Sequence, residues 1–320
     1  MPGPPGDCQT CKNPIMVKCD PKCESFWRHR TGAGFTWLFL SARDADVVFA
    51  TPVDAFAGNQ VPIGPSGVAD TEREHGWRID ASYACSCDSS ITASFTNWES
   101  NTNDFISLPG GVGFVRADLV HPNTLNVAAD SLSARADYDI SYKLADINYR
   151  GLIWGDCRWA VNYLLGVRYG NLDQNLLAEY SILGVTTVET NIDFEGFGPR
   201  VGLDARRKLK GGFQVYSEGF ANFLAGEWRA DFQQNNIFAG QQAASAFTDD
   251  RIVSLLEFEL GVAWSNASGW LTISGGYYVA GWFNSITTRD YVNAVQTNNF
   301  NIDDSHLTFD GFTGAVEVRY

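Results

Sequence analysis

Residues 159–169 read WAVNYLLGVRY, and every second side chain in this stretch is apolar or aromatic. The apolar set consists of Trp159, Val161, Tyr163, Leu165, Val167 and Tyr169. Between them stand Asn162, Gly166 and Arg168. Alternate side chains point to opposite faces of a β-strand, whereas an α-helix repeats every ~3.6 residues and would mix the two sets. The stretch therefore predicts a strand with one apolar face and one polar face.

The end of the chain repeats this pattern over residues 312–320, where charged Glu317 and Arg319 share the polar face. In an outer-membrane barrel the polar face of each strand points into the lumen and the apolar face meets lipid. A tilted strand crosses the hydrocarbon layer with roughly 9–11 residues. Segments of about this length are predicted at 33–43, 76–86, 90–98, 135–149, 157–170, 199–208, 211–225, 250–265, 269–284 and 305–320. We therefore predict an all-β fold, a transmembrane antiparallel β-barrel of about ten strands.

The connections between these segments alternate in length. Short ones lie near 87–89, 150–156, 209–210 and 266–268, and long ones near 44–75, 99–134, 171–198, 226–249 and 285–304. Short turns on one side and long loops on the other are typical of outer-membrane barrels, with both termini on the periplasmic, short-turn side. Twelve strands are the alternative count, because one of the long loops could contain a further hairpin, for example around residues 192–195.

Residues 196–199 contain two glycines and a proline that interrupt the alternation. Before them the apolar side chains stand at even positions, Ile192 and Phe194, and after them at odd positions, Val201 and Leu203. If the apolar face is outward on both sides, the strand needs a β-bulge or bend here.

The cysteines divide the chain into a tail and a barrel. Residues 1–31 are rich in Pro and Cys and show no periodicity, so we predict a periplasmic tail followed by the barrel domain at 32–320. Disulfide candidates are Cys8, Cys11, Cys19, Cys23, Cys85, Cys87 and Cys157. An oxidising compartment favours disulfides within the tail or between the tail and the barrel turns. A zinc site made by the four tail thiolates is the alternative. The tail could also bind an envelope protein or a second copy of the chain.

Composition and motifs exclude several functions. The net charge is −14, and no basic stripe is present that would neutralise nucleic acid phosphates. The chain contains no phosphate loop, nucleophile elbow or dinucleotide fingerprint. The four histidines are scattered, and His306 with Asp304 is most simply a pair of solvated loop residues. We therefore predict no enzymatic activity, no cofactor and no metal site in the barrel.

Charged residues of the predicted strands give the candidate functional site. By alternation, the lumen is predicted to receive Arg78, Asp80, Asp137, Asp139, Lys143, Arg158, Arg168, Arg200, Asp204, Arg206, Glu218, Glu257, Glu259, Glu317 and Arg319. Charged rings of this kind line pores and set their ion preference. The alternative is an ion-pair network that fills a narrow barrel, since barrels of about eight strands are packed solid and those of about 16–18 hold a channel.

Three glycine- and aromatic-rich stretches resemble a known family. They are GVRYG at 166–170, FEGFGPRVGLD at 194–204 and GFQVYSEGFANFLAG at 212–226. They resemble the pore-forming outer-membrane barrels typified by the Legionella-type major outer membrane protein. The resemblance implies an exported barrel in contact with outer-membrane lipid, through which small hydrophilic solutes or ions pass passively, and it brings no catalytic residues. A plugged barrel that anchors or scaffolds an envelope assembly is the alternative.

Overall fold

The computed structural model describes residues 27–320 except 56–59, 109–112, 125–129, 182–183 and 303–304. Ten antiparallel strands form a closed barrel in the order β1-β14-β13-β12-β11-β10-β9-β8-β5-β4. Their bounds are β1 Gly32–Arg43, β4 Glu74–Ser86, β5 Ser89–Ser107, β8 Ser133–Gly155, β9 Trp159–Ser181, β10 Val185–Lys208, β11 Phe213–Asn236, β12 Gly240–Ser265, β13 Leu271–Ser285 and β14 Ser305–Arg319. The predicted fold class and the count of ten strands are confirmed. The tail at 1–26, with four of the cysteines, lies outside the described residues.

The registers of the strand pairs fix the geometry of the barrel. Following direct cross-strand partners from Asp250 on β12 through β11, β10, β9, β8, β5, β4, β1, β14 and β13 leads back to β12 at Val262, 12 residues further along. A stagger of this size tilts the strands by roughly 40° and leaves a narrow interior in a barrel of this strand number.

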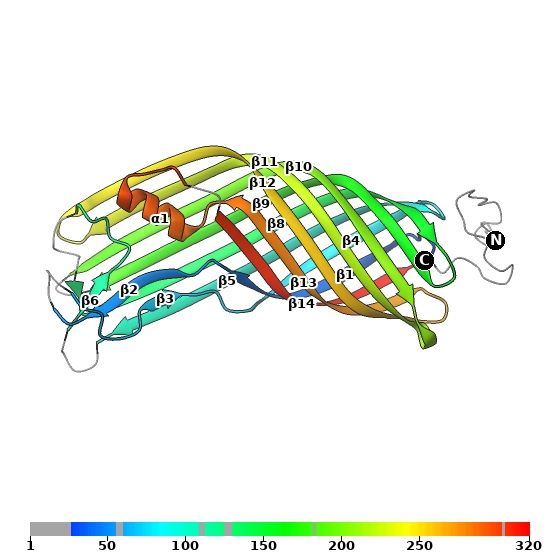
Figure 1. Ribbon diagram of the computed structural model, residues 1–320, viewed down its shortest axis with the longest axis horizontal. Helices are drawn as coiled ribbons and strands as arrows, with labels where there is room; N and C mark the ends of the chain where they lie inside the picture. Colours follow the sequence, from blue (N-terminus) through cyan, green and yellow to red (C-terminus); the bar gives the residue numbers. More distant parts are fainter. Residues whose placement is uncertain (1–26, 56–59, 109–112, 125–129, 182–183, 303–304) are drawn as a thin grey trace, which may run out of the picture.

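The two ends of the barrel differ. Short connections join β4 to β5, β8 to β9, β10 to β11 and β12 to β13 at the end where both Trp27 and Tyr320 lie, which we call the turn end (Figure 1). The opposite end, which we call the loop end, carries the long connections from β1 to β4, from β5 to β8 and from β13 to β14, together with the short connections from β9 to β10 and from β11 to β12. At the turn end Gly211 and Gly212 have positive φ angles of 72° and 87°, a backbone conformation that favours glycine.

The strands extend beyond their predicted limits at the loop end. Strands β5 and β8 to β12 have 19–26 residues, whereas β1, β4, β13 and β14 have 12–15. The residues predicted as the long loops 171–198 and 226–249 mainly continue β9 to β12, so they add length to existing strands and no extra hairpin. The long strands therefore form a wall that projects past the short ones.

Smaller elements cover this projecting wall. Strands β2 Val47–Val53, β3 Gly67–Ala69, β6 Phe114–Ala117 and β7 Asp130–Ser131 form a separate four-stranded sheet, and α1 spans Thr288–Thr297 at the loop end (Figure 1). Tyr291 of α1 donates a hydrogen bond to the carbonyl oxygen of Ala230 on β11 at 2.8 Å. Among the described residues no helix is long and apolar enough to cross a membrane.

Along the long strands, the apolar side chains change from the exterior face near the turn end to the lumen face near the loop end. Near the turn end of β8, Ile147 and Tyr149 face outward and Asp146 faces the lumen. Toward the loop end of the same strand, Tyr138 and Ile140 are buried in the lumen, so the alternating side chains between them face outward. The pairing of β8 with β9 shows no register shift between these two regions. The strand keeps its alternation while its surroundings change.

This inversion follows one row of cross-strand partners. On six strands the residue that follows the apolar exterior toward the loop end, and that carries a charged or amide side chain, is Asn97, Lys143, Asn171, Glu195, Glu227 or Asp250. Each of these residues is the direct partner of the next along the row. On the turn-end side of the row the exterior is mostly apolar, as lipid requires, and on the loop-end side the exterior is mostly polar and the interior mostly apolar, as water requires.

The predicted bulge at residues 196–199 is wrong. Strand β10 pairs with β9 without a register shift from Val185 to Arg207. Phe194 is fully buried in the lumen, whereas Val201 and Leu203 are exposed on the exterior. The apolar positions change from even to odd because the strand crosses the polarity inversion, and its faces do not rotate.

Candidate functional site

The lumen near the loop end is filled by aromatic side chains. They are Trp98, Tyr142, Phe194, Trp228, Trp282 and Phe309, all at most 2% exposed. Ring centroids of Trp98 on β5 and Phe309 on β14 lie 5.2 Å apart, and those of Tyr142 on β8 and Phe309 lie 4.8 Å apart. These strands are not neighbours in the barrel, so the contacts reach across the lumen. We call these six side chains the aromatic layer.

The opposite wall closes the aromatic layer in the same way. Phe194 on β10 contacts Trp228 on β11 with ring centroids 4.8 Å apart. Phe194 also contacts Trp282 on β13, with a centroid distance of 6.4 Å and nearly perpendicular rings. The ring centroids of Trp282 and Tyr142 lie 6.4 Å apart. Leu224 and Leu255 are fully buried in the same cluster, so the layer is packed like a protein core.

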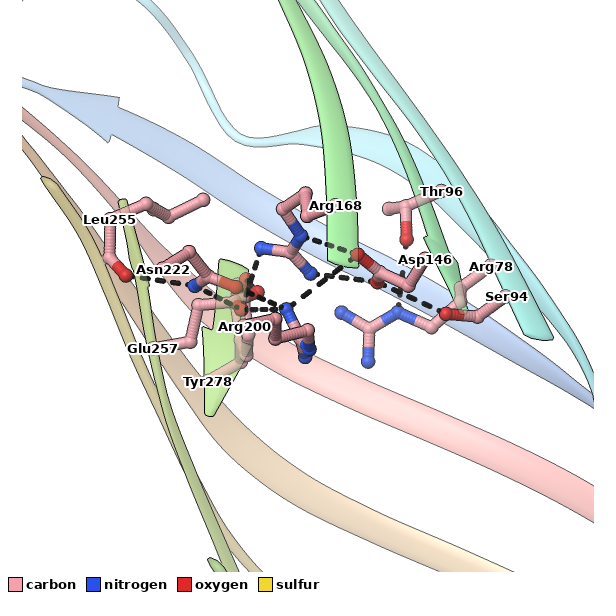
Figure 2. Close-up of polar contacts among 10 residues, drawn as sticks. All are labelled: Arg78, Ser94, Thr96, Asp146, Arg168, Arg200, Asn222, Leu255, Glu257 and Tyr278. Carbon is pink, nitrogen blue, oxygen red and sulfur yellow. Dashed lines mark hydrogen bonds and ion pairs between the residues drawn. The ribbon is translucent and has the colours of Figure 1, made fainter. Parts of the chain in front are cut away.

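A network of charges lies on the turn-end side of this layer (Figure 2). Arg168 on β9 forms a bidentate pair with Asp146 on β8, with Nε–Oδ1 at 2.5 Å and Nη2–Oδ2 at 2.8 Å. Its third nitrogen, Nη1, donates to Oε2 of Glu257 on β12 at 2.6 Å. Arg200 on β10 donates to the same oxygen at 2.6 Å. We call Asp146, Arg168, Arg200 and Glu257 the lumen ion network.

Neutral groups donate further hydrogen bonds to the carboxylates of the network, and a third arginine lies near it. Tyr278 donates its hydroxyl to Oε1 of Glu257 at 2.6 Å, and the side chain of Asn222 donates to Oε2 at 3.2 Å. Ser94 donates to Oδ2 of Asp146 at 3.1 Å, and the guanidinium of Arg78 lies 5.5 Å from the ring centroid of Tyr278. Buried charges are stabilised when they are both paired and hydrogen-bonded, and the carboxylates of Asp146 and Glu257 meet that condition.

A polar cavity occupies the lumen between the ion network and the turn end. Its volume is about 180 Å³. The lining includes Asp80, Arg206, Tyr216, Glu218, Glu259 and Glu317. Arg206 pairs with Glu218 at 3.0 Å, and Glu259 accepts hydrogen bonds from Tyr216 at 2.6 Å and from Thr313 at 2.9 Å. The wall of this cavity carries both signs of charge.

Most of the predicted lumen residues lie on the lumen face of the barrel. These are Arg78, Asp80, Arg168, Arg200, Asp204, Arg206, Glu218, Glu257, Glu259, Glu317 and Arg319. The structure brings Arg168, Arg200 and Glu257 into one network and Asp204, Arg206 and Glu218 into another. That any of them lines an open pore stays a prediction.

Four of the predicted lumen residues are placed elsewhere. Asp137, Asp139 and Lys143 face outward on β8, because they lie on the loop-end side of the polarity inversion, where water contacts the exterior. Asp137 and Asp139 accept hydrogen bonds there from Asn103 and Asn101 on β5. Arg158 is exposed in the turn before β9. The prediction that these four line the lumen is wrong.

Sequence reasoning missed several lumen residues. They include Asp146, Asn148, Arg150 and Asn222. The signal for the first three was present, because they alternate with the exposed side chains of Ile147 and Tyr149 on the turn-end half of β8. The sequence prediction took the face that carries the charged residues of 137–143 as the lumen face of the whole strand, and this assignment hid the signal.

The cysteines and the isolated histidine give no further site among the described residues. Cys85 is exposed and Cys87 is partly buried. The pairings proposed with the tail stay a prediction. His306 lies 3.6 Å from the carboxylate of Asp44, and both side chains are more than half exposed. The part of the chain that the structure describes has no cluster of three or more potential metal ligands.

Comparisons with known proteins give a family. The model of a protein family, described as the Legionella pneumophila major outer membrane protein precursor, matches residues 29–319. A search of curated proteins found no match. Among solved structures the chain is similar to the outer membrane protease OmpT from Escherichia coli, with 10% identity, coverage of 94% of this chain and 99% of that chain, and a TM-score of 0.44. It is also similar to a Pseudomonas aeruginosa FadL homologue, with 6% identity, coverage of 92% and 90%, and a TM-score of 0.26.

Proposed function

This chain belongs to the family of the Legionella pneumophila major outer membrane protein, and on that premise we propose that it is an outer-membrane barrel with a closed lumen and a structural role in the cell envelope. Its place in the bacterial outer membrane follows from the family and from the closed barrel of ten strands. We assign it no catalytic reaction.

The aromatic layer is the observation that carries the proposal. Trp98, Trp228 and Trp282 have at most 1% of their surface exposed, and their contacts join strands on opposite sides of the lumen. A hydrated solute would have to separate these rings, and burying such side chains stabilises the fold by ~2 kcal/mol or more each. The layer therefore supports a plug that belongs to the folding core.

The exterior of the barrel supports an anchoring role. The turn-end exterior is apolar and suited to outer-membrane lipid, while the projecting wall and the sheet of β2, β3, β6 and β7 would stand outside the membrane. In this orientation the turn end and both chain ends are periplasmic. A surface or envelope component would then bind the projecting wall, the loops or the N-terminal tail.

A passive pore for small hydrophilic solutes or ions is the second candidate. The polar cavity favours it, because Asp80, Glu218 and Glu259 form part of a hydrophilic path through the turn-end half of the barrel. Conduction would require a second state in which the aromatic layer opens.

Single-channel recording distinguishes the two candidates. The purified full chain is inserted in a planar bilayer, and insertion is verified by the resistance of the folded barrel to protease and by its heat-dependent mobility in a gel. A closed barrel gives no steady conductance in 1 M KCl. Stable conductance steps that scale with salt concentration would establish the pore and reject the closed barrel. Charge selectivity altered by Glu259→Gln would then place the ion path in the cavity.

A further inference from the structure

Residues 27–30 lie inside the turn end of the barrel, ahead of β1. The side chains of Trp27 and His29 are only 5% and 7% exposed. The backbone N–H of His29 donates to the carbonyl oxygen of Cys87 at 3.0 Å, in the turn between β4 and β5. Arg30 donates to the carbonyl oxygen of Ser268 at 3.0 Å, in the turn between β12 and β13. These two turns are separated by β1 and β14 in the barrel, so the segment crosses part of the opening.

Three guanidinium groups converge on the indole ring of Trp27. Those of Arg150, Arg206 and Arg319 lie 4.9, 4.4 and 4.5 Å from the ring centroid. They come from β8, β10 and β14, which are spread around the barrel. A cation over the face of an indole is attracted by the negative charge of the ring face.

Carboxylates hold these arginines in place from the barrel wall. Arg150 pairs with Asp204, Arg206 pairs with Glu218 at 3.0 Å, and Arg319 pairs with Glu317. All of these partners belong to the barrel strands, so the arrangement does not depend on residues 27–30. A guanidinium that is bound at its edge by a carboxylate leaves its flat face available for stacking on an aromatic ring.

His29 adds a second point of attachment. Its Nδ1 lies 2.8 Å from the hydroxyl of Ser90, and its Nε2 lies 3.3 Å from the side-chain oxygen of Asn162. The amide oxygen can only accept, so Nε2 carries a proton, and in a neutral ring Nδ1 accepts from the serine hydroxyl. Burial of His29 and the nearby charge of Arg150 lower the pKa of this imidazole to about 4, in agreement with the neutral ring.

We propose that Arg150, Arg206 and Arg319 form a binding site for an aromatic side chain, filled by Trp27 of the same chain, and that this site holds residues 27–30 across the turn end of the polar cavity. Trp27, His29 and Arg30 all contribute to the cavity lining. The segment therefore limits access to the cavity from the turn end, independently of the aromatic layer on the other side.

Thiol accessibility tests this site. Ser274 lines the cavity, and Ser274→Cys is introduced into a Cys85→Ser/Cys87→Ser background of the full chain in liposomes. Modification at position 274 by a charged methanethiosulfonate reagent is followed by peptide mass mapping under non-reducing conditions, which separates this position from the five native cysteines that remain. Trp27→Ala is expected to raise the rate at least tenfold, and Trp27→Phe to stay near the parent rate because it keeps an aromatic face. Trp159→Ala, which removes an exterior indole, is the matched control and should leave the rate unchanged. Equal rates in the parent and in Trp27→Ala would overturn the proposal.

Proteolysis of the unmodified chain gives a test that needs no variant. Trypsin cleavage after Arg28 and Arg30 is compared with cleavage after Lys210, which is exposed in the turn before β11. Docking predicts cleavage after Arg28 at least tenfold slower than after Lys210, and comparable rates would contradict it. Steady conductance of the parent chain would reject the closed barrel but leave these two results standing, since they concern only the turn end.

Discussion

Arg168 and Glu257 form an ion pair across the lumen, with Nη1 and Oε2 separated by 2.6 Å and side chains 1% and 2% exposed. They belong to β9 and β12, which are separated by two strands of the barrel. The pair therefore fixes the distance between non-adjacent parts of the wall, in a position that backbone hydrogen bonds do not reach.

Removing the acid of this pair should destabilise the barrel. Glu257→Gln keeps the shape of the side chain but leaves Arg168 and Arg200 without their shared carboxylate. Breaking a buried pair from one side costs about 3–5 kcal/mol. Urea unfolding in detergent micelles measures the loss. Glu227→Gln, on the exterior of β11 beside Arg229, is the matched control and should change the unfolding free energy by about 0.5 kcal/mol or less. Similar losses in both variants would mean that the network contributes nothing specific.

Adjacent leucines on β9 test the lipid-facing exterior. Leu165 is 52% exposed on the apolar exterior, whereas Leu164 is 7% exposed and lines the polar cavity. Leu165→Arg should impair insertion by about 2–4 kcal/mol, because the guanidinium would meet hydrocarbon. Leu164→Arg should be tolerated better, since polar groups surround it. The folded fraction in liposomes gives the comparison, and equal damage would contradict the assignment of the two faces.

The polarity inversion on β8 is tested by two neighbours on its loop-end half. Ile140 is fully buried in the lumen core, and Asp139 faces outward. Ile140→Asp should destabilise the fold by about 3 kcal/mol or more, because it buries a carboxylate without a partner. Asp139→Ala should change stability by about 0.5 kcal/mol or less. Thermal unfolding followed by gel mobility measures both. A large effect of Asp139→Ala and a small effect of Ile140→Asp would restore the lumen position predicted from the sequence.

Acid should release the segment at residues 27–30. The pKa of His29 is lowered from 6.5 to about 4 in the docked state, so the released state binds a proton first. The contribution of His29 to docking is therefore unchanged above pH ~6.5 and is lost as the pH falls toward ~4. The full difference corresponds to about 3 kcal/mol.

Fluorine NMR follows this release through 5-fluorotryptophan at position 27, with Trp27→Phe assigning the resonance. The signal should move toward the exposed position between pH 6.5 and 4. His29→Gln should abolish the pH dependence while keeping a hydrogen bond to Asn162. A pH-independent resonance in the parent chain would contradict the role of the imidazole.

Sequence alone predicted the turn-end half of the barrel well. There the exterior meets lipid and the interior is polar, so the apolar side chains from Trp159 to Tyr169 alternate with residues that, apart from Leu164, are small or polar. The loop-end half could not be predicted by the same rule. Ile192 and Phe194 are as apolar as lipid-facing residues, and nothing in residues 185–198 states that water lies outside and the core inside.

The candidate site was predicted in part for the same reason. Glu257, Arg168 and Arg200 follow from alternation on the turn-end half, whereas in the aromatic layer Tyr142 alternates with residues predicted for the lumen and Phe194 and Trp228 lie in predicted loops. Helix α1 had its own signal, since Thr287 and Asp290 form a cap and Tyr291, Val292 and Val295 face one side. The cross-lumen partners depend on the stagger of the barrel, which no single strand encodes.

The row of partners from Asn97 to Asp250 has a consequence for the bilayer. Because the row returns to β12 twelve residues nearer the turn end, it descends steadily from β12 to β5. The apolar exterior therefore ends nearer to the turn end beside β5 than beside β12. A flat lipid leaflet matches this slanted boundary only if the barrel axis is tilted from the membrane normal. A barrel whose axis is parallel to the normal requires a thinner leaflet next to β5.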